Sequence, residues 1–189
     1  GLKWADFEPL AQGQVTLALT PNGWGAKPGQ LPGWLLLVDV KDKIEPLKTR
    51  LAQLRKSWAD QGQAVRTEKI RDLDFAVLTF ASEDLGKILD HAFPPPAGAE
   101  PPPKPAAPPP KLQWFVGQSD SLLILGNAAA DIENVLARQA NRALPSLSGQ
   151  AGFAAHSGPR FRDATAYSWL NFKTIVQHFI FSMIGKVIV

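Results

Sequence analysis

Between Pro94 and Lys111 the chain reads "PPPAGAEPPPKPAAPPPK", and this tract separates two segments that both have the pattern of β-strands. Ten of the 17 prolines lie between Pro94 and Pro110, so the rest of the chain is not rich in proline. Proline lacks the N–H group that a sheet ladder requires, so the tract cannot itself lie inside a sheet. It is a linker between two domains, a recognition motif or an insertion within one domain, and the organisation of the chain depends on which.

The residues before the tract predict two pairs of strands. "QVTLALT" (14–20) alternates apolar and polar residues, which is typical of a half-buried strand. "WLLLVDV" (34–40) is a continuous apolar run, which predicts a central strand covered on both faces. "AVRTEKI" and "LDFAVLTF" predict a hairpin that turns at Arg71 and Asp72, and "SEDLGKILDHAF" (82–93) predicts a short helix.

The clearest helix lies between these two strand pairs. Asp42 followed by Glu45 three residues later predicts a capping box at its start. Gly62 suits the left-handed conformation that commonly ends a helix. The apolar residues recur at steps of three and four and predict one buried stripe: Ile44, Leu47, Leu51, Leu54 and Trp58.

Beyond the tract the same order of elements returns. "LQWFVGQ" and "SLLILGN" predict two strands that turn at Ser119 and Asp120, and "AAADIENVLARQAN" (128–141) predicts a helix. "ATAYSWLNF" (164–172) alternates enough to predict another strand, and "TIVQHFIFSMIGKVIV" (174–189) is a strongly apolar helix candidate.

The segments on the two sides of the tract are expected to share one core. Three strands and one long helix after Lys111 are too few to be stable alone. We therefore expect one α+β domain over residues 1–189, with a single antiparallel sheet built from two ββα-type units and helices mainly on one face. The proline-rich tract, 94–111, is then an insertion that reaches about 55 Å if it is extended. Because the chain opens with "GLKWADFEPL", without Met or an apolar leader, we expect a fragment of a longer protein.

Composition excludes several classes of chemistry. The chain has no cysteine, so it has no disulfide, no thiolate metal site and no cysteine nucleophile. The net charge is +3, and acidic residues are interleaved with the basic ones. This pattern indicates a solvated helix face rather than a nucleic-acid surface, which needs a sustained charge of one sign. We expect no nucleic-acid partner.

Motifs for catalysis or cofactor binding are not found in the sequence. None of His91, His156 and His178 is within a helical turn of another histidine, as a metal site on a helix would require. "VGQSDS" lacks the second glycine of a nucleophile elbow. "NGWGAKPG" continues into a loop where a dinucleotide fingerprint requires a helix. We predict no catalytic residue, no cofactor and no metal.

Three features are candidates for contacts with a partner protein or for self-association. One is a tryptophan in a loop of Gly and Pro, and another is a P-x-x-P match with a lysine three residues beyond it. The third is the apolar terminal segment, which at 16 residues is shorter than the roughly 20 that a bilayer span needs. For that segment we favour core burial over a subunit contact or a role at a membrane surface. The candidate interface residues are Trp24, Pro105, Pro108, Lys111, Phe179 and Phe181.

Several segments in sequence order resemble an uncharacterised family of bacterial exported proteins. These are "QVTLALT", "GWLLLVDVKD" with the helix that follows it, "FVGQSDSLLILGNAAADIENVLA" and "AYSWLNFKTIV". The resemblance implies a periplasmic or cell-envelope setting and a repeated strand-strand-helix build. It implies no activity and no site residues.

The leading hypothesis is therefore a non-enzymatic binding or assembly module of an exported, cell-envelope protein. The alternative is a hydrolase-type enzyme whose site forms only in three dimensions, with His156, Arg160 and Asp163 as its candidate residues. A third hypothesis is single-stranded nucleic-acid binding on a sheet face that bears Trp114 and Phe75.

Overall fold

A computed structural model of the chain describes residues 8–22, 32–81, 111–141, 144, 146–155, 165–173 and 175–176. By its internal contacts the chain divides into two compact units, 1–133 and 134–189. The boundary falls within a helix and not at the proline-rich tract.

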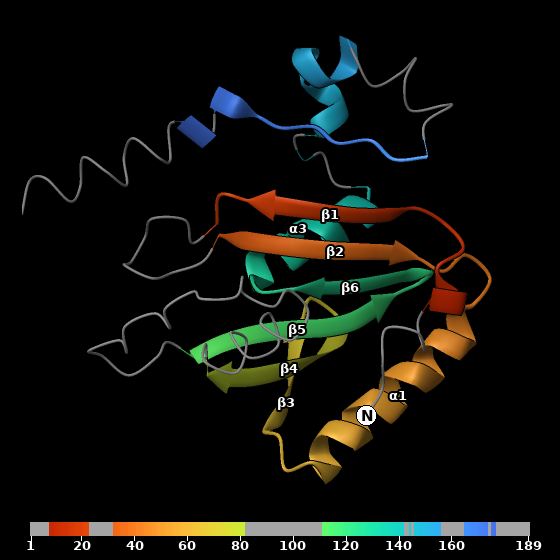
Figure 1. Ribbon diagram of the computed structural model, residues 1–189. Helices are drawn as coiled ribbons and strands as arrows, with labels where there is room; N and C mark the ends of the chain where they lie inside the picture. The colour runs from red at the N-terminus through yellow and green to blue at the C-terminus, as the bar shows by residue number, and fades with distance from the viewer. Residues whose placement is uncertain are drawn as a thin grey trace, which may run out of the picture. The chain divides into compact units, whose positions relative to one another are not determined.

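The described residues contain one six-stranded antiparallel sheet with the order β1-β2-β6-β5-β4-β3 (Figure 1). Its strands are β1 (Val15–Thr20), β2 (Gly33–Asp39), β3 (Val65–Ile70), β4 (Leu73–Ala81), β5 (Lys111–Ser119) and β6 (Leu122–Gly126). Helix α1 (Ile44–Asp60) follows β2, helix α3 (Ala129–Gln139) follows β6, and two short 3-10 helices are η2 (Glu8–Leu10) and η3 (Leu147–Gly149). The predicted α+β class with a single antiparallel sheet is confirmed.

The strands on the two sides of the proline-rich tract are direct neighbours. Ala81, the last residue of β4, pairs with Lys111, the first residue of β5. The tract therefore does not divide the sheet, and Lys111 belongs to a strand and not to the tract. That residues 1–189 form one domain stays a prediction.

Both predicted hairpins are present, and the turn of one lies one residue later than expected. In the first, Ile70 pairs with Leu73, so Arg71 and Asp72 form the turn as predicted. In the second, Ser119 pairs with Leu122, so the turn consists of Asp120 and the serine after it. The first residue of each turn has a positive φ, 55° at Arg71 and 48° at Asp120. Aspartate tolerates this left-handed conformation better than most residues, which explains why the turn begins there.

Helix α1 covers one face of the sheet with the apolar stripe that the sequence predicts. Leu47 and Leu51 are buried, and Leu54 and Trp58 pack against the same cluster. The cluster also contains Leu10, Val38, Val40, Val116 and Leu123. Gly62 ends the helix with φ 72°, as predicted.

The predicted capping box at the start of α1 is wrong. The residue that caps the helix is Lys43, and its side chain makes no capping hydrogen bond. The helix begins at Ile44, one residue later than the box requires, so Asp42 lies outside capping position. Glu45 instead pairs with Lys48 at 2.7 Å on the exposed side of the first turn.

The opposite face of the sheet is covered in part by the first turns of α3, which corrects the expectation of helices mainly on one face. Successive side chains of a strand point to opposite faces, so Leu35 and Ile124 lie opposite Val38 and Leu123. Ile132 of α3 is fully buried, and its Cδ1 atom lies 3.7 Å from the position of a Cβ at Gly126. Since β2 and β6 are apolar on both faces, both faces need a cover.

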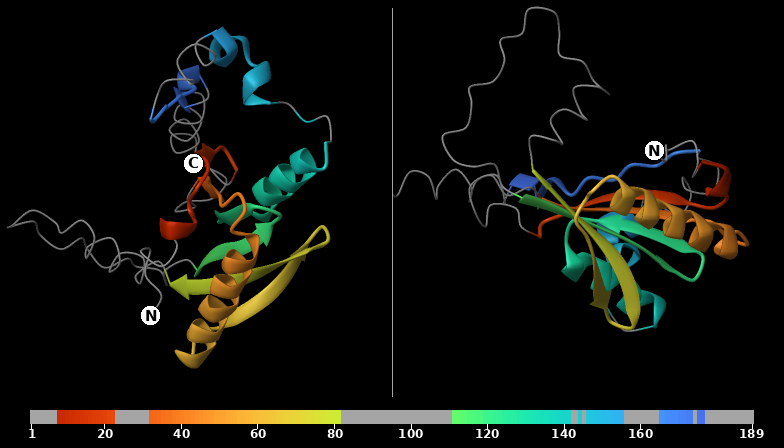
Figure 2. Two further views of the ribbon diagram at one scale, coloured as in Figure 1. Left: turned by 90° about the vertical axis from the view of Figure 1, so that its right-hand side faces the viewer. Right: turned by 90° about the horizontal axis from the view of Figure 1, so that it is seen from below.

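The sheet is strongly twisted, so that β3 and β4 run across the direction of β1 and β2 (Figures 1 and 2). Such a twist is the normal right-handed preference of L-residues summed over several strands. It separates the two edge strands in direction as well as in position.

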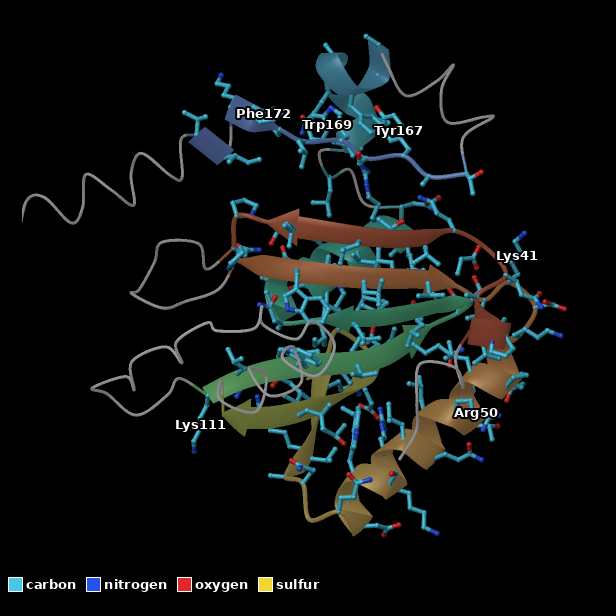
Figure 3. All side chains as sticks on the ribbon, viewed as in Figure 1. Lys41, Arg50, Lys111, Tyr167, Trp169 and Phe172 are labelled. Carbon is cyan, nitrogen blue, oxygen red and sulfur yellow. The ribbon has the colours of Figure 1, made fainter. Side chains whose placement is uncertain are left out.

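The second unit contains a small aromatic cluster. Phe153, in the helical residues 151–155, meets Tyr167 and Trp169 edge to face, with ring centroids 6.0 and 5.8 Å apart (Figure 3). The strand predicted at "ATAYSWLNF" is wrong for its described part, since 165–171 pair with no strand of the sheet. Its alternation instead places the rings of Tyr167 and Trp169, two positions apart, against Phe153.

Candidate functional site

A sheet that is not closed has two edges, and here they are β1 and β3. Within the described ranges no strand pairs with the outer side of either. An edge strand presents unpaired N–H and C=O groups and is a template for pairing with another chain. Natural sheets manage this hazard with charged residues, bulges or covers, so the composition of each edge is informative.

The β3 edge is protected by charge. Its six residues, "VRTEKI", include Arg66, Glu68 and Lys69. Arg66 and Glu68 form an ion pair with 2.8 Å between the guanidinium Nη2 and the carboxylate Oε2. Pairing another strand here would require dehydrating these charges, which opposes the association.

The β1 edge has the opposite character. Its six residues, "VTLALT", include no charged residue. Val15 is 51% exposed, and Leu17 and Leu19 are each 72% exposed. We call these three residues the apolar row. They are the exposed large apolar side chains of the sheet in the described structure.

The backbone of β1 directs the hydrogen-bonding groups of the apolar row outward. The Asp39 N–H donates to the Gln14 carbonyl (3.0 Å), and across β2 the Asn127 N–H donates to the Trp34 carbonyl (3.3 Å). Backbone groups of successive residues in an antiparallel strand point to opposite sides, so the odd-numbered residues of β2 face β1. Their partners in β1 are Thr16, Ala18 and Thr20. The backbone groups that point away from β2 therefore belong to Val15, Leu17 and Leu19.

One end of β1 is held by a buried carboxylate at the start of α3. The Thr20 hydroxyl donates to Oδ2 of Asp131 at 2.6 Å, and the Asn22 side-chain amide donates to Oδ1 of the same group. Asp131 is 5% exposed. Gly33 makes this approach possible, because a Cβ there would collide with both Thr20 and Asp131. The network fixes the position of β1 without using its outer side.

The other end of β1 is held through Asp39. The carbonyl of Asp39 accepts from the Gly13 N–H at 2.8 Å, and its carboxylate accepts from the Lys41 N–H at 2.9 Å. This bond from the Lys41 backbone, together with one from the Ser121 hydroxyl, holds the pKa of Asp39 below its usual value of 3.8. Such a carboxylate is ionised near neutral pH and serves as an anchor rather than as a proton acceptor.

The apolar row continues across the sheet into a partly covered apolar surface. Leu17 is opposite Leu36 and Leu19 is opposite Trp34, so these side chains share one face. Trp34 in turn meets Trp114 of β5 edge to face, with ring centroids 5.3 Å apart. The exposed leucines are therefore the rim of a larger apolar surface and not isolated residues.

A second candidate is a shallow groove of about 650 Å³ beside α1. Its lining includes Lys48, Arg55, Asp74 and Asp120, so the charges balance and attract no ion of one sign. Gln118 also lines it, and its amide donates to the carbonyl of Asp120 at 2.8 Å and to the first residue of α1 at 3.2 Å. Its Oε1 atom is buried without a partner in the described structure. These contacts fasten the helix to the hairpin turn and define no ligand.

Neither a metal centre nor a membrane span is found in the described part of the chain. Its Asp and Glu side chains form no group of three or more that is able to hold a metal ion. None of its helices combines the length and the apolar character needed to cross a bilayer.

Most of the residues that the sequence singled out lie outside the described ranges. Of the candidate interface residues only Lys111 is described, and it is exposed at the start of β5, with its side chain pointing away from the sheet (Figure 3). The other candidate interface residues outside these ranges are Trp24, Pro105, Pro108, Phe179 and Phe181. The candidate hydrolase residues His156, Arg160 and Asp163 are outside them as well.

The two aromatic residues of the nucleic-acid hypothesis do not share a face. Leu78 of β4 pairs with Trp114, and Phe75 is three positions away from Leu78, so its side chain lies on the other face. Phe75 is fully buried against Gly117, where a Cβ would lie 2.5 Å from its ring. A stacking platform made of these two rings is therefore excluded.

Sequence reasoning missed the apolar row, although it identified the strand. The alternation of "QVTLALT" predicts a half-buried strand, but the structure leaves its apolar residues exposed. The sequence signal was the absence of charge in this strand; that the strand lies at an edge is known only from the pairing.

Comparison of this chain with models of known protein families, with curated proteins and with solved structures found no match. The resemblance to exported bacterial proteins therefore stays an expectation.

Proposed function

We propose that this chain is a non-enzymatic binding or assembly module, and that its interaction element is the β1 edge. It would act by strand addition, in which an extended segment of a partner extends the sheet. The observation that carries this proposal is that outward backbone groups and exposed apolar side chains belong to the same three residues. A partner strand would satisfy both at once.

The expected gain from strand addition is sufficient for specific binding. Each new backbone hydrogen bond contributes about 0.5–1.5 kcal/mol net. Burying an exposed leucine or valine contributes about 1.5–3 kcal/mol when burial is complete, and less at an edge. The costs of association take up a large part of this total. Binding in the micromolar range is the expected result.

The proposal is tested with a peptide probe and residue-resolved amide exchange. The probe is a short peptide of alternating threonine and valine with a lysine at each end, and the control is the same peptide N-methylated at alternate residues. The unmodified probe is expected to slow exchange at Leu17 and Leu19 by tenfold or more. The amide of Ala18 is already bonded to β2 and should change little. The same result with the N-methylated peptide, or no change with either, would contradict strand addition.

The cellular setting is proposed to be the cell envelope of a bacterium, reached by export. Support comes from the resemblance of the strand-strand-helix segments to exported proteins. The test is fractionation of cells that express the full-length gene product. Recovery of that product in the cytoplasm alone would contradict an envelope role and would leave the binding proposal unaffected.

A further inference from the structure

We propose that the strand added to β1 is β1 of a second copy of this chain. This inference rests on the proposed function and names its partner. The two copies are related by a two-fold axis, and their sheets join into one continuous antiparallel sheet. A two-fold contact uses the same surface patch on both copies, so the patch must be complementary to itself.

The geometry of β1 satisfies that requirement in one register. If Leu17 pairs with Leu17 of the second copy, Val15 pairs with Leu19 in both directions. Every pair then joins residues whose backbone groups point outward, and each pair exchanges two hydrogen bonds. Residues directly opposite each other in an antiparallel pair lie on the same face, and so do alternate residues of one strand. The apolar rows of the two copies therefore lie on one face of the joined sheet.

Neighbouring registers are poorer. A shift that centres the axis on Ala18 places Val15 opposite Pro21, which has no N–H to donate. A shift that centres the axis on Thr16 pairs Val15 with Leu17 but places Leu19 opposite Gly13, outside the strand. The register centred on Leu17 is therefore the one that uses the whole apolar row.

The lack of charged residues favours a second copy at the β1 edge over the β3 edge. Each copy has a net charge of +3, so two copies repel except where the approaching surfaces carry no charge. The β1 edge carries none, whereas joining two β3 edges would require dehydrating Arg66, Glu68 and Lys69 of both copies. Joining β1 to β1 also uses the unprotected edge of each copy and leaves two charged β3 edges outside. The assembly therefore closes at two copies.

The size of the contact sets the concentration at which it is observed. A single pair of short strands buries less than the roughly 1,200 Å² at which stable interfaces begin. Association of two copies is therefore expected to be weak, and it is measured at chain concentrations from about 1 to 500 µM. At the upper end the expected mass is twice the 20.5 kDa of the chain.

The first experiment compares edge variants of the 189-residue chain by sedimentation equilibrium. Leu17→Lys places a charge on each side of the axis and is expected to weaken association by at least tenfold. The matched control is Thr67→Lys on the exposed β3 edge, which should associate as the wild type does. Equal loss in both variants, or a wild type that is monomeric at 500 µM, overturns the proposal. Circular dichroism confirms that each variant is folded.

The second experiment tests the register by disulfide formation, using the absence of native cysteine. In the proposed register the Leu17 Cα atoms are about 5.5 Å apart, within the range of a disulfide. Leu17→Cys should therefore cross-link under mild oxidation. Leu19→Cys and Thr67→Cys should not, since residue 19 faces residue 15. Equal cross-linking of Leu17→Cys and Leu19→Cys overturns the register.

The two proposals fail in different ways. A monomeric wild type whose Leu17 amide is protected by the threonine–valine peptide retains strand addition and rejects the second copy as the partner. A monomeric wild type with no protection rejects both. Slow exchange at Leu17 in a monomer without any peptide also rejects both, because the edge is then already paired within one copy.

Discussion

The two edges of the sheet have the same length and opposite chemistry. β3 has "VRTEKI", with three charged residues, and β1 has "VTLALT", with none. At β3 the residue that closes the strand, Ile70, is 6% exposed, whereas at β1 Leu17 is 72% exposed. A sheet whose two edges had the same role would be protected alike on both. This difference is the basis for our proposal that the sheet continues at β1 and ends at β3.

The largest expected difference in stability is between two variants that each remove one apolar side chain, one at each edge strand. Ile70→Ala creates a cavity in the core and should lower the free energy of unfolding by about 2–5 kcal/mol. Leu17→Ala removes an exposed side chain and should change it by less than about 0.5 kcal/mol. Urea unfolding at low micromolar concentration, where the chain is a monomer, measures both. A large loss in Leu17→Ala would mean that β1 is buried in the monomer, and the comparison would fail.

The next largest effect concerns the anchor of β1. Asp131→Ala leaves the Thr20 hydroxyl and the Asn22 amide without their acceptor and should cost about 1–3 kcal/mol. Glu133→Ala, an exposed position on the same helix, is the control and should be nearly neutral. Amide exchange should also accelerate at Thr20 and Ala18 in the first variant alone. An unchanged exchange rate there would show that Asp131 does not position the edge.

A smaller effect is expected from the ion pair that protects β3. A double-mutant cycle with Arg66→Ala and Glu68→Ala should give a coupling energy of about 0.2–1 kcal/mol, because Arg66 is 55% exposed and Glu68 33%. The pair of Lys48 and Glu45 on α1 is more exposed and serves as the comparison. The double variant should also associate more readily, since its edge has lost two charges. No gain in association would argue against charge as the protection.

The smallest effect is the pH dependence contributed by Asp39, the last residue of β2, which lies beside the start of β1. Its pKa is lowered in the folded state, so its charged form stabilises the fold above the usual value of 3.8. That contribution is lost as the pH falls through the folded pKa. Asp39→Asn should therefore be less stable than the wild type at pH 6, and the difference should shrink as the pH falls below 4. If the urea midpoints of the wild type and of Asp39→Asn differ by the same amount at pH 6 and at pH 3, this role of Asp39 is contradicted.

Much of the fold was predictable because the signals were local. The apolar stripe from Leu47 to Trp58 requires a helix whatever surrounds it, since residues three and four apart share a side. The turn at Arg71 follows from the two alternating runs that flank it. The turn at Asp120 was misplaced by one residue, although aspartate tolerates the left-handed conformation with which that turn begins. The capping box at Asp42 failed because cap geometry depends on where the first helical residue falls.

The candidate site was less predictable because it is a property of pairing. An alternating strand such as 14–20 has one apolar side in the sequence, and the sequence does not say whether that side is covered. The aromatic strand predicted at 164–172 shows the same ambiguity, since its alternation serves contacts to Phe153. Phe75 and Trp114 were assigned to one face, and the register separates them.

The sequence by itself determined which segments are strands and helices and that strands on both sides of the proline-rich tract belong to one sheet, because these follow from periodicity and from the size of a stable core. Only the tertiary structure decided the order of the strands, and hence which of them are edges. It also decided which helix covers each face of the central strands, whose continuous apolar runs had already predicted a cover on both. The physical reason is that backbone hydrogen bonds between strands are nearly independent of side-chain identity, so pairing is settled by the packing of the whole sheet.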